Sequence, residues 1–187
     1  MIFLDLRRMV NSPLANALDV SIRNVPDFPK PGIQFKDITP ILKDQVLCDQ
    51  IADAFFEYFS SKSIDVVVGI ESRGFLFGMM LANKLQVPFV PIRKQGRLPA
   101  DTLAMEYNLE YGSATIEIHS DAFSAGSRVL IHDDLLATGG TVVAASELIE
   151  RMGGDVAGYA FVISLDFLGG KQRLQPFNND ILSLVDY

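Results

Sequence analysis

The chain has 187 residues, enough to bury a sizeable core, and we expect residues 1–187 to form a single domain. Its content of 49% hydrophobic and 21% charged residues is ordinary for a globular protein, and no apolar run approaches the roughly 20 residues that a membrane-spanning helix needs. The net charge of −7 disfavours a general nucleic-acid binder, and the order of apolar and basic residues at the start is the reverse of that in a secretory signal peptide.

The first 20 or so residues are expected to be partly helical and peripheral. Three prolines within 25–32 fix the backbone and remove N–H donors, which excludes a helix or a central strand there. From Gln45 to Phe59 apolar residues recur with a helical period, which predicts a helix. Cys48 lies in this stretch. As the single cysteine it excludes an intrachain disulfide, and we expect a buried, inert thiol in a protein of the reducing cytoplasm.

The middle of the chain alternates between strand and helix patterns. The β-branched run 65–70 predicts a buried strand, 73–85 a helix with two small glycines, and 87–93 another strand. The polar stretch 94–104 contains glycine and proline, so it is predicted to be a mobile loop. Residues 105–119 alternate between apolar and polar types around a Tyr-Gly pair, which predicts a solvent-facing antiparallel pair of strands.

The last third continues this alternation. Strands are predicted at 128–132 and 156–165, a helix at 139–152, and an edge strand at 181–187. Both histidines lie in strand-like runs without the spacing of metal ligands, so we expect structural roles for them. The alternating segments together predict an α/β domain with a mostly parallel sheet flanked by helices.

Three of the predicted strands end in unusual polar sequences: GIESRG, PIRKQG and HDDLLATGG. In open α/β sheets, ligands bind beyond the carboxyl ends of the strands. We therefore expect these three strand ends to meet in one site.

The sequence DDLLATGGT, from Asp133 to Thr141, combines two carboxylates with a loop of small residues at the start of a helix. Backbone N–H groups at such a helix start bind a phosphate, and neighbouring carboxylates accept hydrogen bonds from sugar hydroxyls. The pattern therefore predicts a ribose 5-phosphate site, although a capped strand–helix turn is the alternative. It is neither a Walker loop nor a Rossmann fingerprint, because the required glycine and lysine spacings are missing.

The segment VLIHDDLLATGGT resembles the phosphoribosyl-pyrophosphate (PRPP) motif of the type I phosphoribosyltransferases. The segments NVPDFPKPGIQFKDITPIL, GIESRGFLFG, IRKQGRLP and LEYG occur in the order and spacing found in the adenine phosphoribosyltransferase family. The resemblance covers roughly residues 22–175. The PRPP motif specifies only the superfamily, whereas the proline-rich segment and ESRGFLFG indicate adenine.

The resemblance implies the type I phosphoribosyltransferase fold, with a five-stranded parallel core, a small hood from about 22–40, a flexible loop over 94–109, and a homodimer. It leaves residues 1–20 as an N-terminal extension. It implies the conversion of adenine and PRPP to AMP and pyrophosphate in purine salvage. The implied cofactor is Mg²⁺, which would be held mainly by PRPP and water and directly by no protein residue.

Site residues follow from these motifs together with the resemblance. Glu110 is implied to be the acid/base residue that faces the purine, and the Glu71–Ser72 peptide is implied to be cis. Phe35 would stack on the base, and one arginine, Arg93, would serve the site of the neighbouring subunit. The PRPP- and AMP-binding residues are expected to be Ser72, Arg73, Arg93, Lys94, Arg97, Asp133, Asp134, Ala137, Thr138, Gly139, Gly140 and Thr141, and the adenine-binding residues Gln34, Phe35, Lys36 and Leu165.

Two departures from the family pattern and several alternatives stay open. His132 stands where the family usually has an aliphatic residue, and Ser164 replaces a more usual Glu or Asn. Arg97 could be a solvated loop charge, Phe35 a core residue and Glu110 an exposed strand residue. The protein could use another purine, or it could be a PRPP-sensing regulator that keeps the fold without the catalysis.

Overall fold

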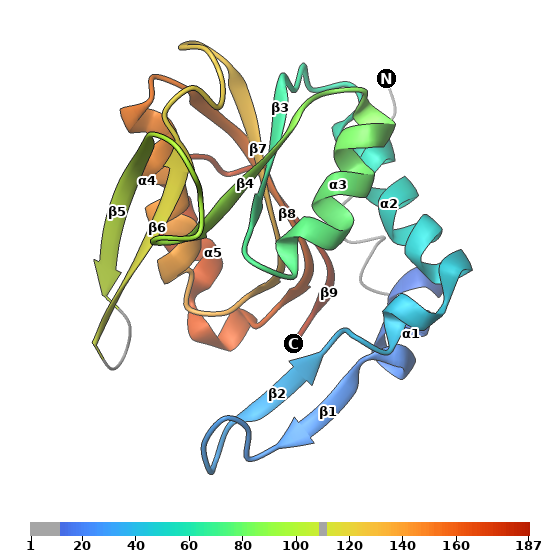
Figure 1. Cartoon of the computed structure of the whole chain (residues 1–187). Coiled ribbons are helices and arrows are strands. Elements are labelled where there is room, and N and C mark those ends of the chain that lie inside the picture. The colour runs from blue at the N-terminus through green and yellow to red at the C-terminus, as the bar shows by residue number, and fades with distance from the viewer. Residues whose placement is uncertain (1–11, 109–111) are drawn as a thin grey trace.

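The computed structural model describes residues 12–108 and 112–187. Its centre is a seven-stranded sheet with the strand order β5-β6-β4-β3-β7-β8-β9, and a separate two-stranded sheet is formed by β1 and β2 (Figure 1). Along the chain the elements are α1 (Pro13–Ser21), β1 (Arg23–Pro26), β2 (Gln34–Asp37), η2 (Ile41–Lys43), α2 (Gln45–Phe59), β3 (Val66–Ile70), α3 (Gly74–Leu85), β4 (Phe89–Lys94), β5 (Thr102–Asn108), β6 (Ser113–His119), β7 (Arg128–Leu136), α4 (Gly140–Arg151), β8 (Asp155–Ser164), η3 (Asp166–Leu168), α5 (Gly170–Leu174) and β9 (Ile181–Asp186), where η marks a 3-10 helix.

Five neighbouring strands of the large sheet, β4, β3, β7, β8 and β9, are parallel, and β6 and β5 extend the sheet antiparallel beyond β4. This confirms the predicted α/β fold with a mostly parallel sheet and places β9 at one edge. The predicted helix at 45–59 is confirmed as α2, which begins where the Asp44 carboxylate accepts a hydrogen bond of 3.0 Å from the Leu47 amide.

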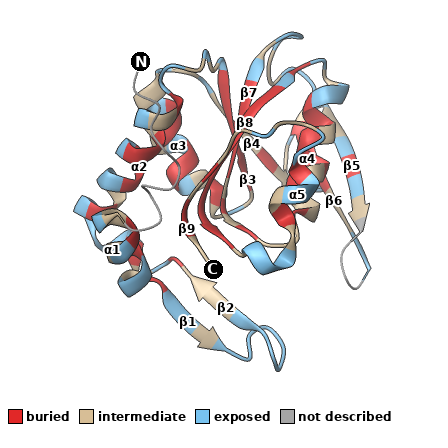
Figure 2. Cartoon of the chain, turned by 180° about the vertical axis from the view of Figure 1, so that it is seen from behind, coloured by how far each residue is buried: buried red, intermediate tan, exposed pale blue. Residues whose placement is uncertain are grey.

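Two layers of helices cover the sheet. Helices α1, α2 and α3 lie on one face and α4 and α5 on the other, so the central strands are buried between them (Figure 2). Every residue of β3 is buried, as its continuous β-branched sequence predicts for a strand covered on both sides. Consequently the polar side chains after these strands can gather only where the strands end. Among the described residues, no helix is long and apolar enough to cross a membrane.

The loop predicted for the polar stretch 94–104 is wrong at its last three residues, which belong to β5. Residues Thr102–Asn108 form a strand that pairs antiparallel with Ser113–His119. Leu103, Met105 and Tyr107 alternate toward the core, where they pack with residues of α4. The alternation of inward- and outward-facing residues therefore begins at Thr102, three residues before the predicted start at 105. The hairpin predicted around the Tyr-Gly pair is confirmed, although its turn at 109–111 lies outside the described residues.

The N-terminal segment is less peripheral than predicted. Helix α1 confirms the expected partial helix, but Ala15 and Leu18 on its inner face are buried in the core shared with α2 and β9. Residues 1–11 lie outside the described part of the chain. After α1, strands β1 and β2 form an antiparallel hairpin that stands apart from the sheet, in the region where a hood is expected (Figure 1).

Two further expectations concern single side chains. The Cys48 thiol is half-buried rather than buried, and its Sγ lies 3.4 Å from the carbonyl oxygen of Ile41. Burial, followed by the nearby carboxylates, raises the pKa of this thiol above its ordinary value, which fits an unreactive group. His119 has a structural contact, because its Nε2 lies 2.7 Å from the Pro99 carbonyl oxygen.

His132 is fully buried in β7. Its ring packs edge-on against Phe55 with a centroid distance of 5.3 Å, and neither ring nitrogen has a hydrogen-bond partner. Burial lowers the pKa of His132 to about 4, so the imidazole is neutral near pH 7. The ring packs there like an apolar core side chain.

Replacing His132 with leucine should make the fold less sensitive to acid. Between pH 6.5 and about 4 the unfolded chain takes up a proton on His132 and the folded chain does not, so falling pH favours unfolding. In the wild type, protonation of His132 in the unfolded chain should therefore lower the free energy of unfolding by about 3 kcal/mol between pH 7 and pH 4. Urea unfolding of wild type and His132→Leu at both pH values measures the difference. Equal acid losses in wild type and His132→Leu would contradict the assignment.

Candidate active site

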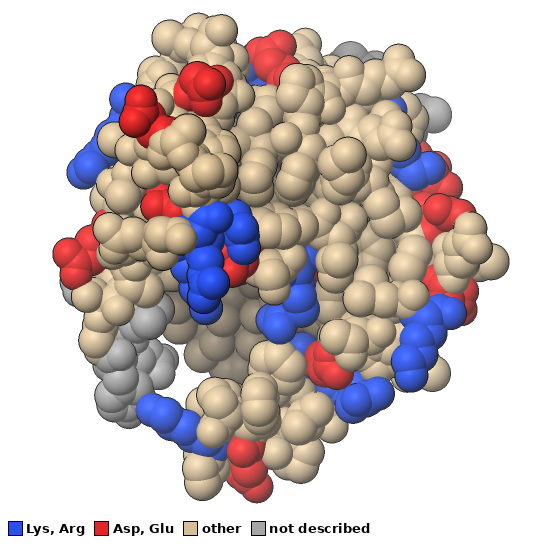
Figure 3. Space-filling model, viewed as in Figure 1, with Lys and Arg blue, Asp and Glu red and all other residues tan. Residues whose placement is uncertain are grey.

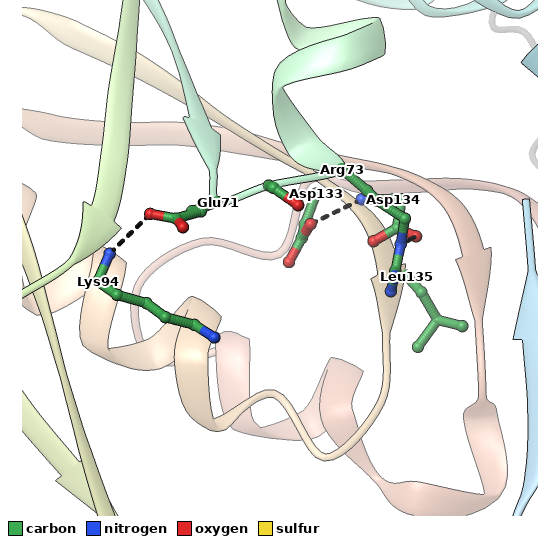
Figure 4. A pocket seen from close by; sticks show the side chains of 7 residues that line it. Glu71, Arg73, Lys94, Asp133, Asp134 and Leu135 are labelled. Carbon is green, nitrogen blue, oxygen red and sulfur yellow. Dashed lines mark hydrogen bonds and ion pairs between the residues drawn. The ribbon is translucent and has the colours of Figure 1, made fainter. Parts of the chain in front are cut away.

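The three polar strand ends meet, as predicted. A cavity of about 280 Å³ lies where β3, β4 and β7 end, and side chains from the three segments face one another across it (Figure 4). It is lined by Glu71, Ser72, Arg73, Lys94, Asp133, Asp134 and Leu135. Five of these residues are in the predicted PRPP site, whereas Glu71 and Leu135 were not predicted to belong to it.

The turn from β3 into α3 brings the first group of residues to the cavity. The Glu71–Ser72 peptide is cis, as the resemblance implies, and Arg73 stands at the start of α3. The next residue must be glycine, because a Cβ at Gly74 would lie 2.8 Å from the His132 carbonyl oxygen and 3.1 Å from an Asp133 carboxylate oxygen. This close contact holds the start of α3 directly against β7.

An ion pair crosses the cavity between these two elements. The Nε of Arg73 donates to Oδ2 of Asp134, whose side chain is almost fully buried (Figure 4). Asp133 beside it has a raised pKa, first because of burial and second because of the charge of Asp134. Strand β7 continues through both aspartates to Leu136, four residues beyond the predicted end at His132, so the carboxylates lie on a strand rather than in a loop.

The end of β4 is held by a carboxylate that was missed in the sequence. Oε2 of Glu71 accepts hydrogen bonds of 3.1 Å from Nε of Arg93 and from the backbone N–H of Lys94. Burial alone would raise the pKa of Glu71, but the Lys94 amide and the Arg93 guanidinium lower it below its ordinary value. Glu71 thus stays ionised and fixes the backbone from which the Lys94 side chain enters the cavity.

A second missed carboxylate, Glu117 of β6, organises the turn that follows β4. It is 4% exposed, and its Oε1 accepts hydrogen bonds of 2.9 and 2.8 Å from the backbone N–H groups of Arg97 and Leu98. The Arg97 side chain is exposed and does not line the cavity. Arg93 also points along this turn, where its Nη1 donates to the Arg97 carbonyl oxygen at 3.0 Å. These two arginines are therefore beside the cavity rather than in it.

The predicted phosphate loop joins β7 to α4. It lines a smaller cavity of about 90 Å³, formed by residues 137–142 together with Asp133 and Leu135. Gly139 has φ +80°, a left-handed conformation that favours glycine, and it directly precedes the first turn of α4. Backbone N–H groups at a helix start attract anions. Because Asp133 and Leu135 line both cavities, a bound molecule could extend from one into the other.

The hairpin β1–β2 faces this site from the other side. Phe35 of β2 packs edge-on against Phe28 with a ring-centroid distance of 5.1 Å, and the Arg73 guanidinium carbon lies 5.4 Å from the Phe35 ring centroid. Figure 3 shows a hollow between the hairpin and the body of the sheet, with Lys and Arg side chains around it. Phe35 is thus beside the site and not in the core of the sheet.

The structure shows the positions of some of the remaining predicted residues but not of Glu110. Gln34 and Lys36 flank Phe35 in β2, and Leu165 follows β8, where its amide donates to the Leu136 carbonyl oxygen at 2.9 Å. Glu110 lies outside the described residues. Within 12–108 and 112–187, no group of three or more His, Cys, Asp or Glu residues could hold a metal ion.

A five-stranded parallel sheet, a carboxylate pair on a strand before a glycine loop, and a hairpin that faces both define the type I phosphoribosyltransferase fold. The family model described as "Phosphoribosyl transferase domain" matches residues 37–177. The chain belongs to this family.

Three similar proteins are adenine phosphoribosyltransferases. An adenine phosphoribosyltransferase from Koribacter versatilis is 50% identical over 175 residues, which cover 94% of this chain and 95% of that protein. The crystal structure of an adenine phosphoribosyltransferase from Thermoanaerobacter pseudethanolicus has a TM-score of 0.89 and 47% identity, and covers 92% of this chain and 99% of that one. The enzyme from Saccharomyces cerevisiae, crystallised with an imino-altritol bisphosphate and adenine, has a TM-score of 0.85 and 43% identity, with 91% and 98% coverage.

The assignment of the loop can be tested with a matched pair of glycine variants. Gly139 and Gly153 have φ values of +80° and +79°, and an added Cβ would lie 3.2 Å from the Gly170 carbonyl oxygen and 3.1 Å from the Ala125 Cβ, so alanine should strain both backbones and crowd one neighbour in each case. Of the two, only Gly139 lies at the loop cavity. We expect Gly139→Ala to weaken binding of ribose 5-phosphate at least about tenfold in calorimetry, since a shift of the loop away from Gly170 also moves the N–H groups that would hold a phosphate. Gly153→Ala should bind as wild type, and a similar loss in both variants would assign the effect to strain alone.

Proposed function

We propose that the protein is an adenine phosphoribosyltransferase of purine salvage, which converts adenine and PRPP to AMP and pyrophosphate. The observation that carries this proposal is the pair of adjoining cavities, one at the glycine loop and one with cationic and anionic side chains, facing an aromatic ring on the hairpin. The similar proteins named above support adenine as the base.

The ribose 5-phosphate part of PRPP would bind between the aspartates and the glycine loop. N–H groups and hydroxyls of Ala137, Thr138, Gly139, Gly140 and Thr141 would hold the 5-phosphate, and the carboxylates of Asp133 and Asp134 would accept hydrogen bonds from the ribose hydroxyls. Burial and the charge of Asp134 raise the pKa of Asp133, whose side chain lines both cavities and so lies between the proposed positions of the sugar and of the 5-phosphate.

The pyrophosphate part would bind in the larger cavity near Ser72, Arg73 and Lys94. Pyrophosphate leaves more easily when its charge is neutralised, and these cations supply part of that neutralisation. Arg73 would exchange its bond to Asp134 for one to the pyrophosphate. The exposed Arg97 would join when the turn moves closer, and Arg93 would reach the site of a neighbouring subunit.

Mg²⁺ would accompany PRPP and be held mainly by its phosphates and by water. The cavity suits this, because the carboxylates of Glu71, Asp133 and Asp134 can accept hydrogen bonds from metal-bound water. When bound, Mg²⁺ would supply further neutralisation of the leaving group. The protein residues around it orient the sugar and the pyrophosphate.

The base would stack on Phe35, with backbone groups of Gln34 and Lys36 at its hydrogen-bonding edge and Leu165 on the side of the sheet. Glu110 would remove or hold the ring proton so that N9 can attack the anomeric carbon as pyrophosphate departs. Its carboxylate would also stabilise positive charge that develops on the ribosyl centre.

A cytoplasmic homodimer is part of the same proposal. The side chains of Leu76 and Met79 on α3 are 40% and 56% exposed, and a second subunit would cover such apolar groups. The single cysteine fits a reducing compartment.

A radiolabelled-adenine assay with PRPP and Mg²⁺ tests the function directly. We expect AMP formation from adenine, and a kcat/KM for hypoxanthine that is at least about a thousandfold lower than that for adenine. A site that binds the exocyclic amine of adenine leaves polar groups of the protein unpaired when a carbonyl takes the place of the amine. Comparable use of hypoxanthine would indicate another purine as substrate. Binding of PRPP without turnover of any purine would indicate a regulator.

The role of Glu110 has a kinetic test. We expect Glu110→Gln to lower the single-turnover rate at least about tenfold, while the dissociation constants for adenine and PRPP and the Tm change little. Single-turnover conditions are needed because product release can hide the chemical step. Glu106→Gln is the matched control, since Glu106 is an exposed carboxylate on β5 of the same hairpin. An unchanged rate in Glu110→Gln would leave the proton transfer to another group.

A further inference from the structure

A tyrosine junction connects α1, the hairpin and the end of β9. The hydroxyl of Tyr187 donates a hydrogen bond of 2.5 Å to Oδ1 of Asp19 on α1. The ammonium group of Lys36 on β2 lies 3.4 Å from the centroid of the Tyr187 ring, which is a close cation–π contact. One side chain therefore touches two segments that are remote from it in the sequence.

The backbone of Tyr187 makes a third connection. Its N–H donates to the Ser164 carbonyl oxygen at 2.9 Å, and its own carbonyl oxygen accepts from the Asp166 N–H at 2.8 Å. These two bonds bracket Leu165, the residue proposed on the sheet side of the base. Tyr187 thus contacts the segment that carries Leu165 through its backbone and the strand that carries Phe35 through its ring.

Such contacts add to the anchoring of the hairpin, whose two ends are held in the core by the buried Ile22 and Ile38. Strands β1 and β2 hydrogen-bond to each other in a sheet of their own, and a two-stranded hairpin is only marginally stable alone. Arg73 also touches Phe35, but the proposed reaction draws that guanidinium to pyrophosphate. The contact between Lys36 and Tyr187 lies outside the PRPP cavities and can persist when substrates bind.

We infer that Tyr187 is a positioning residue for the purine, which sets the distance between Phe35 and Leu165 through Lys36 and is itself oriented by Asp19. This inference rests on the proposed function. It also gives α1 a part in base binding, because the buried Ala15 and Leu18 anchor the helix that carries Asp19.

The chain contains a matched control for this junction. Tyr58 on α2 donates a hydrogen bond of 2.8 Å to Asp180, and the ammonium group of Lys62 lies 3.5 Å from its ring centroid. Tyr58 and Tyr187 are both half-buried and have the same kinds of partner. Asp180 precedes β9 and Tyr187 follows it, so the two junctions lie at opposite ends of that strand.

The experiment compares Tyr187→Leu with Tyr58→Leu in the full-length protein. We expect Tyr187→Leu to raise the KM for adenine about three- to tenfold, the size of a lost cation–π contact, with the KM for PRPP within twofold of wild type. Tyr58→Leu should lower the Tm to a similar degree and leave both KM values unchanged. An unchanged adenine KM in Tyr187→Leu, or equal rises of the adenine KM in both variants, would overturn the inference.

A second pair of variants tests the contact if Tyr187→Leu does not fold. Lys36→Met removes the cation and keeps the aliphatic stem, so it should raise the adenine KM by a similar factor, whereas Lys36→Arg should restore a value near wild type. Equal adenine KM values in Lys36→Met and wild type would refute the role of the contact. A wild-type protein that does not convert adenine would instead refute the proposed function, so the two failures are distinguishable.

Discussion

The candidate site depends on the close contact between the start of α3 and strand β7. At Gly74 there is no room for a Cβ beside the His132 carbonyl oxygen, and this approach places Arg73 next to Asp134. The same contact turns the end of β3 toward the aspartates, so that side chains far apart in the sequence line one cavity. Any larger residue at position 74 would have to separate α3 from β7, and separation would open the cavity that the strand ends form.

At the candidate site, carboxylates hold two arginine side chains, Arg73 and Arg93, in a chain with a net charge of −7. Asp134 binds Arg73, and Glu71 binds Arg93 and the backbone of Lys94. An anionic substrate must therefore compete with fixed carboxylates for these cations, and a few local charges outweigh the distant acidic surface because salt screens interactions beyond about 10 Å. This arrangement orders the site, since Arg73 and Lys94 already line the cavity before a substrate arrives.

Much of this could be predicted from the sequence, because the strong signals are local. The helical period over 45–59 and the β-branched run before Glu71 identify α2 and β3, and the polar strand ends follow from the rule for parallel sheets. What could not be predicted depends on packing between remote segments. In the sequence, Glu117 is one more polar residue of an alternating strand. In the structure it is buried under a turn, and its carboxylate accepts hydrogen bonds from the N–H groups of that turn. Leu18 reads as part of a peripheral segment, and only the position of α1 against α2 and β9 shows that it belongs to the core.

Arg73 connects the two halves of the candidate site, since its guanidinium pairs with Asp134 and lies over the ring of Phe35. In the proposed reaction these two partners serve different substrates, Asp134 the ribose and Phe35 the base. A sugar hydroxyl that donates to Asp134 weakens the hold on Arg73, and a pyrophosphate attracts the released guanidinium. Movement of that single side chain would uncover the face of Phe35 on which a purine stacks. The occupation of the sugar site and the accessibility of the base site are thereby linked through one arginine, without any movement of the central sheet that carries Asp134 or of the hairpin that carries Phe35.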